Sequence, residues 1–326
     1  MSGGPVLVWV SAGQKVRYRR ALDRVERRLD AVAAVPSGAL GEACRATLAA
    51  GGKRVRPLLT LLCARTGAAL GEPVLRGATA VELVHMATLV HDDVLDRAEL
   101  RRGRPTVVHA YGVEIAVSAG NYLLARAFQE LAESGDAAAV DTLSAAAVGL
   151  SEGEVLQRDD SHRVTVSVAE YERRCERKTA DLFAAACRLG ALLGAAPAAT
   201  AALAEYGRLI GLAFQVFDDI LDCSGDERAT GKRPGTDVRD GTVTLPMIFA
   251  LQEQPRLEPL LARSGLTDAE VVEALRLIAE SGALQRARAV ALGYIEQARA
   301  VLTACPGPVE RGLLEQVAAQ VVDRYS

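Results

Sequence analysis

Apolar and polar positions along the chain follow a helical spacing. Between short breaks that carry glycine and proline lie segments of roughly 15–25 residues without strand-like alternation. Alternation occurs only briefly, at residues 164–168. No break is long enough to be a linker between domains. The pattern therefore predicts an all-α fold in a single domain that covers residues 1–326.

Composition favours the same elements. Half of the 326 residues are apolar, which is enough for a sizeable core, and only 4% are aromatic. Alanine and leucine dominate, and both are strong helix formers. The net charge of −3 argues against a general nucleic-acid binder.

The cysteines and the N-terminal residues indicate a compartment. Six cysteines show neither a Cys-x-x-Cys spacing nor a zinc-binding pattern, so we expect reduced thiols. The N-terminal residues lack the basic region and the long apolar run of a secretion signal. No stretch approaches the roughly 20 apolar residues of a membrane span. We therefore expect a soluble, cytoplasmic protein.

An acidic motif occurs twice and is the most informative pattern in the chain. Asp92-Asp93-x-x-Asp96 ends an apolar helix expected at about residues 79–100, and Asp218-Asp219-x-x-Asp222 ends another at about 202–223. Residues four apart share a helix face, so the outer aspartates of each motif form a carboxylate pair. The middle aspartates point to the side.

Paired carboxylates of this kind indicate a metal site. Like charges four residues apart destabilise a bare helix by about 0.2–0.5 kcal/mol, which a bound cation would offset. Oxygen ligands with few carboxylates per ion suit Mg²⁺, which also takes substrate phosphates as ligands. The alternative is a solvated acidic face, but two copies on apolar helices favour the metal.

Basic groups near the motifs indicate anion binding. Lys53 and Arg56 lie on a glycine-containing turn just before a helix, where an anion is favoured. Arg101 and Arg102 follow the first motif at once, although charge balance with nearby acids is an alternative. Lys178 and Lys232 add further cations, Lys232 in a long polar loop typical of a lid. Together these groups predict a substrate that carries diphosphate.

Two uncharged or weakly charged side chains share the acidic faces. His85 lies two helical turns before Asp92, and Gln215 lies three residues before Asp218. The Gln215 amide oxygen could face a developing positive charge. An ordinary packed histidine and an ordinary buried glutamine are the alternatives.

Ten segments, in order over most of the chain, resemble the trans-polyprenyl diphosphate synthases. They are Gly-Gly-Lys53-x-x-Arg56-Pro, Glu82-x-x-His85, Asp92-Asp-x-x-Asp96, Arg101-Arg102-Gly-x-Pro-Thr, Gly120-Asn-Tyr-Leu-Leu-Ala, Gly153-Glu-x-x-Gln157, Lys178-Thr179-Ala, Phe214-Gln215-x-x-Asp218-Asp-x-x-Asp222, Gly231-Lys232-x-x-Gly-x-Asp237 and Thr244-Leu-Pro. The resemblance implies an isoprenoid-synthase helical bundle around a deep central cavity, usually homodimeric. It also implies condensation of isopentenyl diphosphate with an allylic diphosphate, and peripheral membrane association through a lipophilic product.

The resemblance implies roles for the charged residues. Mg²⁺, three ions with substrate bound, is expected at Asp92, Asp96 and Asp218, with Asp93, Asp219 and Asp222 in support. The leaving diphosphate is expected at Arg101, Lys178 and Lys232, and the isopentenyl diphosphate at Lys53, Arg56, His85 and Arg102. Thr179 and Gln215 are expected to steady the allylic cation.

Two residues depart from the family pattern. Asn121 stands where an aspartate is usual, and Thr242 stands where many members have a lysine. We expect altered kinetics rather than loss of activity.

Small residues behind the first motif bear on product length. Ala87 and Thr88 lie about one helical turn before Asp92, and one turn of roughly 5 Å is comparable to one isoprene unit. Because neither residue is a large aromatic floor, the sequence predicts a product of about six to ten isoprene units. A deeper floor at Tyr122, Phe128 or a partner residue would give a geranylgeranyl or farnesylgeranyl product instead.

Three further alternatives differ in class. A class I terpene cyclase shares the aspartate motifs but needs no isopentenyl site. A regulatory subunit tends to lose the motifs, and both are intact here. A catalytic subunit of a heteromeric synthase remains an open alternative.

Overall fold

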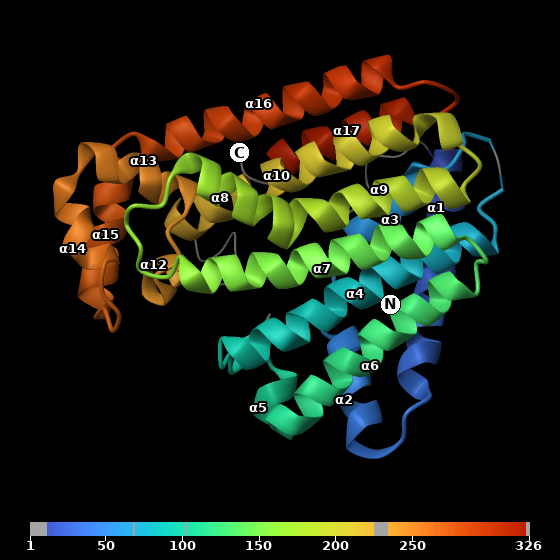
Figure 1. Cartoon of the computed structure of the whole chain (residues 1–326), viewed down its shortest axis with the longest axis horizontal. Coiled ribbons are helices and arrows are strands. Elements are labelled where there is room, and N and C mark those ends of the chain that lie inside the picture. The colour runs from blue at the N-terminus through green and yellow to red at the C-terminus, as the bar shows by residue number, and fades with distance from the viewer. Residues whose placement is uncertain (1–11, 68, 102, 225–233, 324–326) are drawn as a thin grey trace. The chain divides into compact units, whose positions relative to one another are not determined.

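The computed structural model describes residues 12–67, 69–101, 103–224 and 234–323, and the chain divides into two compact units. Unit 1 comprises Met1–Ala147, Leu182–Gly207 and Val301–Gln316, and unit 2 comprises Val148–Asp181, Arg208–Ala300 and Val317–Ser326. Most described residues are helical (Figure 1). The predicted all-α class is confirmed.

Unit 1 contains the N-terminal helices and one hairpin. Its elements are α1 (Ala12–Ala34), α2 (Gly38–Ala49), α3 (Val55–Leu62), α4 (Glu72–Leu95), β1 (Leu100–Arg101), β2 (Arg104–Pro105), α5 (Val107–Tyr111), α6 (Val113–Ala132), nearly all of α9 (Asp181–Leu193) and the 3₁₀ turn Pro197–Ala199. The strands β1 and β2 pair antiparallel.

Unit 2 contains the second acidic motif. Its elements are α8 (Val168–Cys175), the π-helical turn Glu176–Ala180, α12 (Thr236–Asp240), α13 (Leu245–Glu253), the 3₁₀ turn Pro255–Leu257, α14 (Glu258–Leu261) and α15 (Asp268–Glu280). Four helices contribute residues to both units: α7 (Ala137–Asp159), α10 (Thr200–Ser224), α16 (Ala283–Ala304) and α17 (Arg311–Asp323).

Helix α4 forms the centre of unit 1 and packs along α6 (Figure 1). Residues 77–84 in its middle turns are all buried, as in a helix that is packed on every side. Gly120 lies against the His91 ring, and a Cβ there would be 2.2 Å from Nε2. Near the other end of α4, Arg76 Nη1 donates to Glu130 over 2.9 Å. The two helices therefore run antiparallel, with His91 opposite Gly120 in the first half of α6.

The helix that carries the first motif differs from its prediction at both ends. It spans Glu72–Leu95 rather than residues 79–100. Pro73 lies in its first turn, where the missing N–H is harmless, so the helix begins seven residues before its predicted start. The chain then turns into the β1–β2 hairpin, which ends the helix early and leaves Asp96 as its C-cap.

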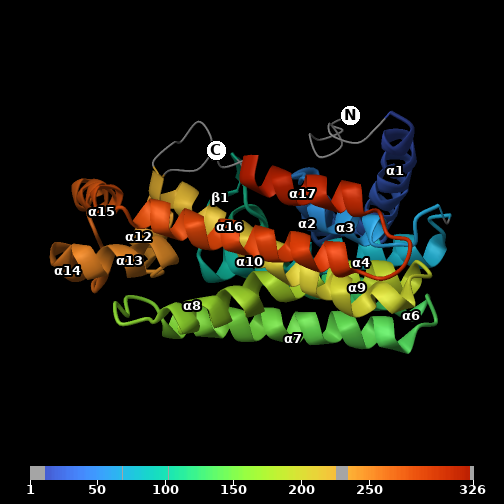
Figure 2. The same ribbon diagram turned by 90° about the horizontal axis from the view of Figure 1, so that it is seen from above.

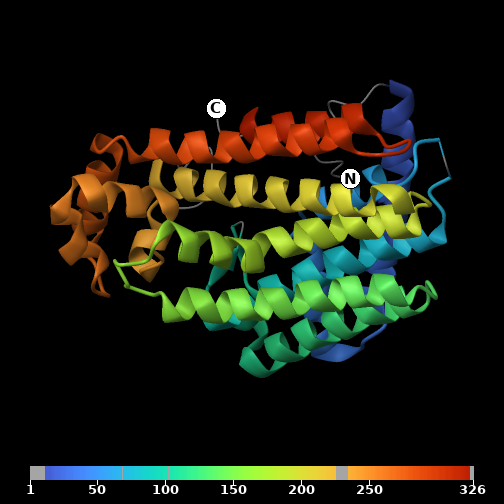
Figure 3. The same ribbon diagram turned by 45° about the horizontal axis from the view of Figure 1, so that its top comes forward.

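Unit 2 packs α10 between neighbouring helices. Within this unit α7 and α8 lie side by side in Figure 2, and α16 runs beside α10 in Figure 3. The Arg288 guanidinium lies 5.9 Å from the centre of the Phe217 ring, which joins α16 to α10. Residues 164–168 form no strand, because Ser167 caps α8 through its hydroxyl and Glu170.

Two absences concern the whole described chain. None of its helices is both long and apolar enough to cross a membrane. All six cysteines are buried, and none forms a disulfide bond.

Candidate active site

The first acidic motif presents its outer and middle aspartates differently. Asp92 is half-buried, and Asp96 is exposed at the helix end with its N–H bonded to the Asp92 carbonyl over 2.8 Å. Asp93 is only 4% exposed, and its Oδ1 accepts from both Nε and Nη2 of Arg101 at 2.8 Å. Arg101 thus contacts the middle aspartate of the motif.

The hairpin after the motif explains this contact. Because β1 folds back on β2, Arg101 returns toward the last turn of α4. The Ala98 N–H donates to the Asp93 carbonyl over 3.0 Å, and the Thr106 hydroxyl donates to the Ala98 carbonyl. The adjacent Arg102, predicted to hold isopentenyl diphosphate, lies outside the described residues.

The basic turn before α3 uses its three cations in three ways. Arg54 adopts a left-handed conformation with φ of 51° and pairs with Glu26 and with the buried Glu82, the latter at 2.8 Å. Lys53 is exposed. Arg56 is half-buried, with its guanidinium 4.5 Å from the centre of the Phe183 ring. The sequence did not indicate that Arg54 has a structural role.

Arg56 carries a buried polar atom without a hydrogen bond. Its Nε is buried and has no partner. Burial lowers the pKa of Arg56 to about 10, which nearby Glu82 opposes, so the side chain is still charged at neutral pH. A buried donor that makes no hydrogen bond destabilises the folded state. An anion that accepts a hydrogen bond from Arg56 Nε would remove this cost.

Three other predicted residues lie on α4. His85 is half-buried, and Ala87 is fully buried. The Thr88 hydroxyl donates to the His85 carbonyl over 2.8 Å. This bond satisfies the hydroxyl within the helix and leaves Thr88 nearly apolar toward its surroundings.

The second acidic motif repeats the division between outer and middle aspartates. Asp218 is exposed, and Asp222 is half-buried. The Asp222 carboxylate accepts from the backbone N–H groups of Thr236 at 3.1 Å and Asp237 at 3.0 Å. This contact ties the motif to the start of α12.

Asp219 is buried and fully engaged. Its Oδ2 accepts from the Tyr171 hydroxyl over 2.6 Å, and its Oδ1 accepts from Gln215 Nε2 over 2.8 Å. Burial raises the pKa of Asp219 to about 7, while the bonds from Tyr171 and Gln215 act in the opposite direction. Both middle aspartates are thus buried and hydrogen-bonded.

The π-helical turn places Lys178 and Thr179 beside α10. A π-turn inside a helix is frequent at functional sites. Thr179 Oγ1 donates to Gln215 Oε1 over 2.7 Å, and Lys178 Nζ donates to Glu154 over 2.6 Å. Gly153 permits this packing, because a Cβ there would lie 2.6 Å from the Lys178 backbone nitrogen.

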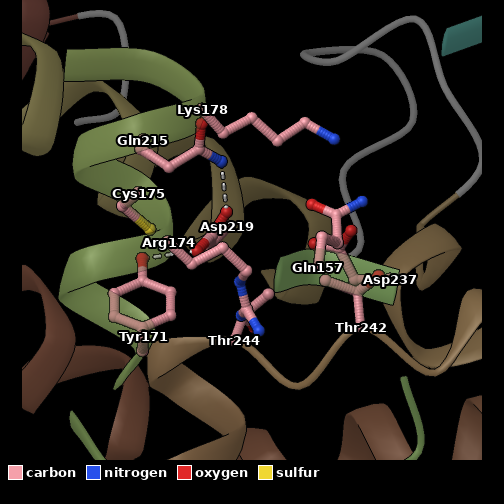
Figure 4. Close-up of a pocket in the computed structure, with 10 residues that line it drawn as sticks. All are labelled: Gln157, Tyr171, Arg174, Cys175, Lys178, Gln215, Asp219, Asp237, Thr242 and Thr244. Atoms are coloured by element: carbon pink, nitrogen blue, oxygen red, sulfur yellow. Dashed lines mark hydrogen bonds between the residues drawn. The ribbon is translucent and has the colours of Figure 1, made fainter. Parts of the chain in front are cut away.

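A pocket in unit 2 adjoins these residues (Figure 4). In Figure 4 the Gln215 amide faces Asp219, with Tyr171 below them. Its lining is Gln157, Tyr171, Arg174, Cys175, Lys178, Gln215, Asp219, Asp237, Thr242 and Thr244. Thr242, which stands where many relatives in the resemblance have a lysine, therefore lines this pocket together with Lys178. A lysine at this position would have added a cation to the pocket.

Comparison with known proteins identifies the family. Residues 38–278 match the family model described as polyprenyl synthetase. The chain belongs to the polyprenyl synthetase family.

Relatives agree with this family over nearly their whole length. Heptaprenyl diphosphate synthase component 2 of Geobacillus stearothermophilus is 40% identical over 305 residues, 93% of this chain and 95% of that protein. Geranylgeranyl diphosphate synthase of Methanosarcina mazei is 38% identical over 294 residues, 87% of this chain and 90% of that one. A solved polyprenyl synthase from Caulobacter crescentus, complexed with calcium and isoprenyl diphosphate, has a TM-score of 0.84 at 35% identity and covers 100% of both chains.

The resemblance inferred from the sequence motifs is confirmed, and so are the isoprenoid-synthase helical fold and the prenyltransferase class. Members of this polyprenyl synthetase family depend on a divalent metal and use isopentenyl and allylic diphosphates. The assignment of individual residues to metal and substrate stays a prediction.

The predicted site residues of this polyprenyl synthetase group within the two units. Unit 1 holds Lys53, Arg56, His85, Ala87, Thr88, Asp92, Asp93, Asp96 and Arg101, and unit 2 holds Lys178, Thr179, Gln215, Asp218, Asp219 and Asp222. Lys232, like Arg102, lies outside the described residues. Tyr171 was missed, although it lies seven residues before Lys178, a spacing of about two helical turns.

Proposed function

We propose that this prenyltransferase adds isopentenyl diphosphate repeatedly to an allylic diphosphate and makes a trans-polyprenyl diphosphate of about six to ten isoprene units. One observation carries the proposal most. In both motifs the middle aspartate is buried among protein donors, whereas the outer aspartates lie at or near the surface. The outer carboxylates are therefore accessible to a metal and its substrate.

The donor set of these motifs fits Mg²⁺. Across the described ranges, no group of three or more His, Cys, Asp or Glu side chains is arranged to hold an ion unaided. A site of paired carboxylates that relies on substrate phosphates for its remaining ligands is typical of Mg²⁺. We assign Asp92, Asp96 and Asp218 to the metal, with Asp222 in support. Bound Mg²⁺ would stabilise negative charge on the leaving diphosphate.

Arg56 and Lys53 form the proposed site for isopentenyl diphosphate, together with His85. The buried Nε of Arg56 and the exposed Lys53 offer one oriented donor and one point charge at the surface. Arg binds phosphate oxygens through a planar fork and Lys through a point charge, so the pair suits a diphosphate.

The cations proposed for the leaving diphosphate are held by carboxylates. Arg101 is fixed on Asp93, and Lys178 on Glu154. Such partners orient each cation before substrate arrives, which lowers the cost of reorganisation at the reaction step. Because Thr242 supplies no charge, Arg101 and Lys178 carry more of this role, together with Lys232.

The proposed product length rests on the size and burial of two residues of α4, Ala87 and Thr88. Ala87 is fully buried and small, and the Thr88 hydroxyl is satisfied by its own helix, so neither blocks nor strongly polarises a hydrocarbon tunnel. The heptaprenyl component relative agrees with a long product, whereas the geranylgeranyl relative represents the shorter alternative.

One assay tests the reaction and the product together. The purified chain is incubated with radiolabelled isopentenyl diphosphate, farnesyl diphosphate and Mg²⁺, and the products are separated by chromatography. Products of six to ten units support the proposal. Products that stop at four or five units refute the length, and absence of any product from the chain alone points to a required partner.

The partner is proposed to be a second copy of this chain. Helix α6 exposes Val113 and Val117, four residues apart, at 56% and 37%. A second copy that packs on this helix would bury both side chains. The name of the Geobacillus relative, a component 2, favours a different partner as the alternative. Light scattering of the purified chain decides, since a monomer that is inactive alone refutes the homodimer.

Localisation is proposed as cytoplasmic. All six thiols are free, which is usual in a reducing compartment. The lipophilic product would bring the enzyme to a membrane surface without a spanning helix. Fractionation of cells that express the tagged chain tests both statements.

A further inference from the structure

A directed chain of hydrogen bonds runs through unit 2. The Tyr171 hydroxyl donates to Asp219 Oδ2 over 2.6 Å, and Gln215 Nε2 donates to Asp219 Oδ1 over 2.8 Å. Thr179 Oγ1 then donates to Gln215 Oε1 over 2.7 Å. Both ends of the chain donate toward one carboxylate, as Figure 4 shows for the Tyr171, Gln215 and Asp219 portion.

Burial makes this direction costly to reverse. Tyr171 is 1% exposed, Asp219 is 4% exposed and Thr179 is 6% exposed. Hydrogen bonds between buried groups are strong, and a buried polar group without a hydrogen bond destabilises the fold. Asp219 Oδ1 accepts from the Gln215 amide nitrogen while Oδ2 accepts from Tyr171, so the amide oxygen of Gln215 is turned away from Asp219.

The orientation of the Gln215 amide decides whether the Thr179 hydroxyl offers its proton or its lone pairs to a neighbouring group. Because the Gln215 oxygen faces Thr179, the hydroxyl uses its single proton on that oxygen. Toward any other neighbour the Thr179 oxygen offers lone pairs only. A fixed oxygen of this kind stabilises positive charge, whereas a hydroxyl turned the other way would present its proton.

We propose that Tyr171 and Asp219 are positioning residues for prenyl transfer. They orient Gln215, and through it they turn the Thr179 oxygen toward the allylic cation. The inference rests on the proposed function and differs in one part from what the family resemblance implied for Asp219. Asp219 is 4% exposed and both of its oxygens accept from side chains, whereas Asp222 is more exposed, so Asp219 serves as the anchor of the network rather than as a metal ligand.

Arg174 packs against the ring of Tyr171. Its guanidinium lies 5.6 Å from the centre of the Tyr171 ring and is itself fixed by Asp160 at 3.0 Å and the Val243 carbonyl at 2.5 Å. The ring of Tyr171 is therefore held independently of its hydroxyl. Replacing Tyr171 with phenylalanine removes the hydrogen bond and keeps the packing.

The test compares Tyr171→Phe with the wild type at saturating substrates. Loss of one hydrogen bond to a charged group is expected to lower kcat about 10-fold. The KM values for both diphosphates and the Mg²⁺ concentration at half-maximal rate are expected to stay unchanged. A raised Mg²⁺ requirement would instead make Asp219 part of the metal site and overturn the inference.

Tyr294→Phe is the matched control. Its hydroxyl also bonds a carboxylate of unit 2, Glu172, over 2.6 Å, but it lies outside the network. This variant should lose similar stability and keep its kcat. Equal kcat values for Tyr171→Phe and Tyr294→Phe would refute a positioning role.

A double variant shows whether Tyr171 acts through Thr179. Thr179→Val removes the oxygen at nearly constant shape, and adding Tyr171→Phe to it should lower kcat no further. Additive losses would show that Tyr171 acts elsewhere, even if one single variant folds poorly. A wild type that is inactive as a homodimer refutes the proposed function itself, whereas an active wild type with an unaffected Tyr171→Phe refutes only the inference.

Discussion

Gly153→Ala tests whether the exact packing of α7 on the π-helical turn matters for catalysis. A Cβ at this position would lie 2.6 Å from the Lys178 nitrogen, 2.9 Å from its Cα and 3.0 Å from the Arg177 carbonyl carbon. All three are backbone atoms, so no flexible side chain can move aside. Ordinary contact begins at 3.4 Å, and the turn must therefore shift by about 0.8 Å.

The shift is expected to cost far more activity than stability. Overpacking costs about 1–3 kcal/mol, and replacing a helical glycine by alanine returns up to about 1 kcal/mol. The free energy of unfolding should thus fall by about 2 kcal/mol or less. A misplacement near 1 Å can lower a rate on the order of 100-fold, and the shift moves Lys178 and Thr179 together, so we expect kcat to fall about 10- to 100-fold.

Steady-state kinetics and thermal unfolding measure the two effects. Gly293→Ala is the control, because it lies in helix α16 and its added Cβ meets nothing within 4 Å. This control should be as stable as the wild type or slightly more so, with full activity. If Gly153→Ala turns over within twofold of the wild type, the position of the π-turn does not control the reaction.

Three further predictions concern other parts of the chain. Ala87→Phe should shorten the product toward farnesyl or geranylgeranyl diphosphate, because a ring replaces a buried methyl group; unchanged radiolabelled products on chromatography would contradict the proposed tunnel. Arg56→Gln should raise the KM for isopentenyl diphosphate about 10-fold through loss of a charged donor, with the KM for the allylic substrate unchanged; equal rises in both would remove Arg56 from the isopentenyl site. Bonds from the backbone and hydroxyl of Ser167 lower the pKa of Glu170 from 4.5 to about 2, so its contribution to stability is present above pH 4.5 and is lost as pH falls toward 2. Glu170→Gln should therefore flatten that part of the curve of melting temperature against pH, and an unchanged slope would show that the α8 cap contributes nothing there.

Much of the fold could be predicted because its causes are local. Helix propensity and apolar spacing act over a few residues, so the all-α class and the helices that carry both motifs were predictable. The ends of α4 were not, because Pro73 suits a first turn as well as a break, and tertiary packing of the next turns decides between them. The hairpin that ends α4 at Leu95 likewise gave no strong sequence signal.

The aspartate spacing and the surrounding cations were enough to predict a site for metal and diphosphate, since such ligands are determined by residue type, and the resemblance of ten motifs gave the family. Only the tertiary structure decided how each side chain is used. It buried Asp93 against Arg101 and Asp219 against Tyr171, and it made Arg54 a structural ion pair beside the unsatisfied Arg56. Tyr171 and Asp219 are 48 positions apart, and their hydrogen bond exists because two helices pack together. Burial and hydrogen-bond partners depend on such distant neighbours, which a local pattern does not contain.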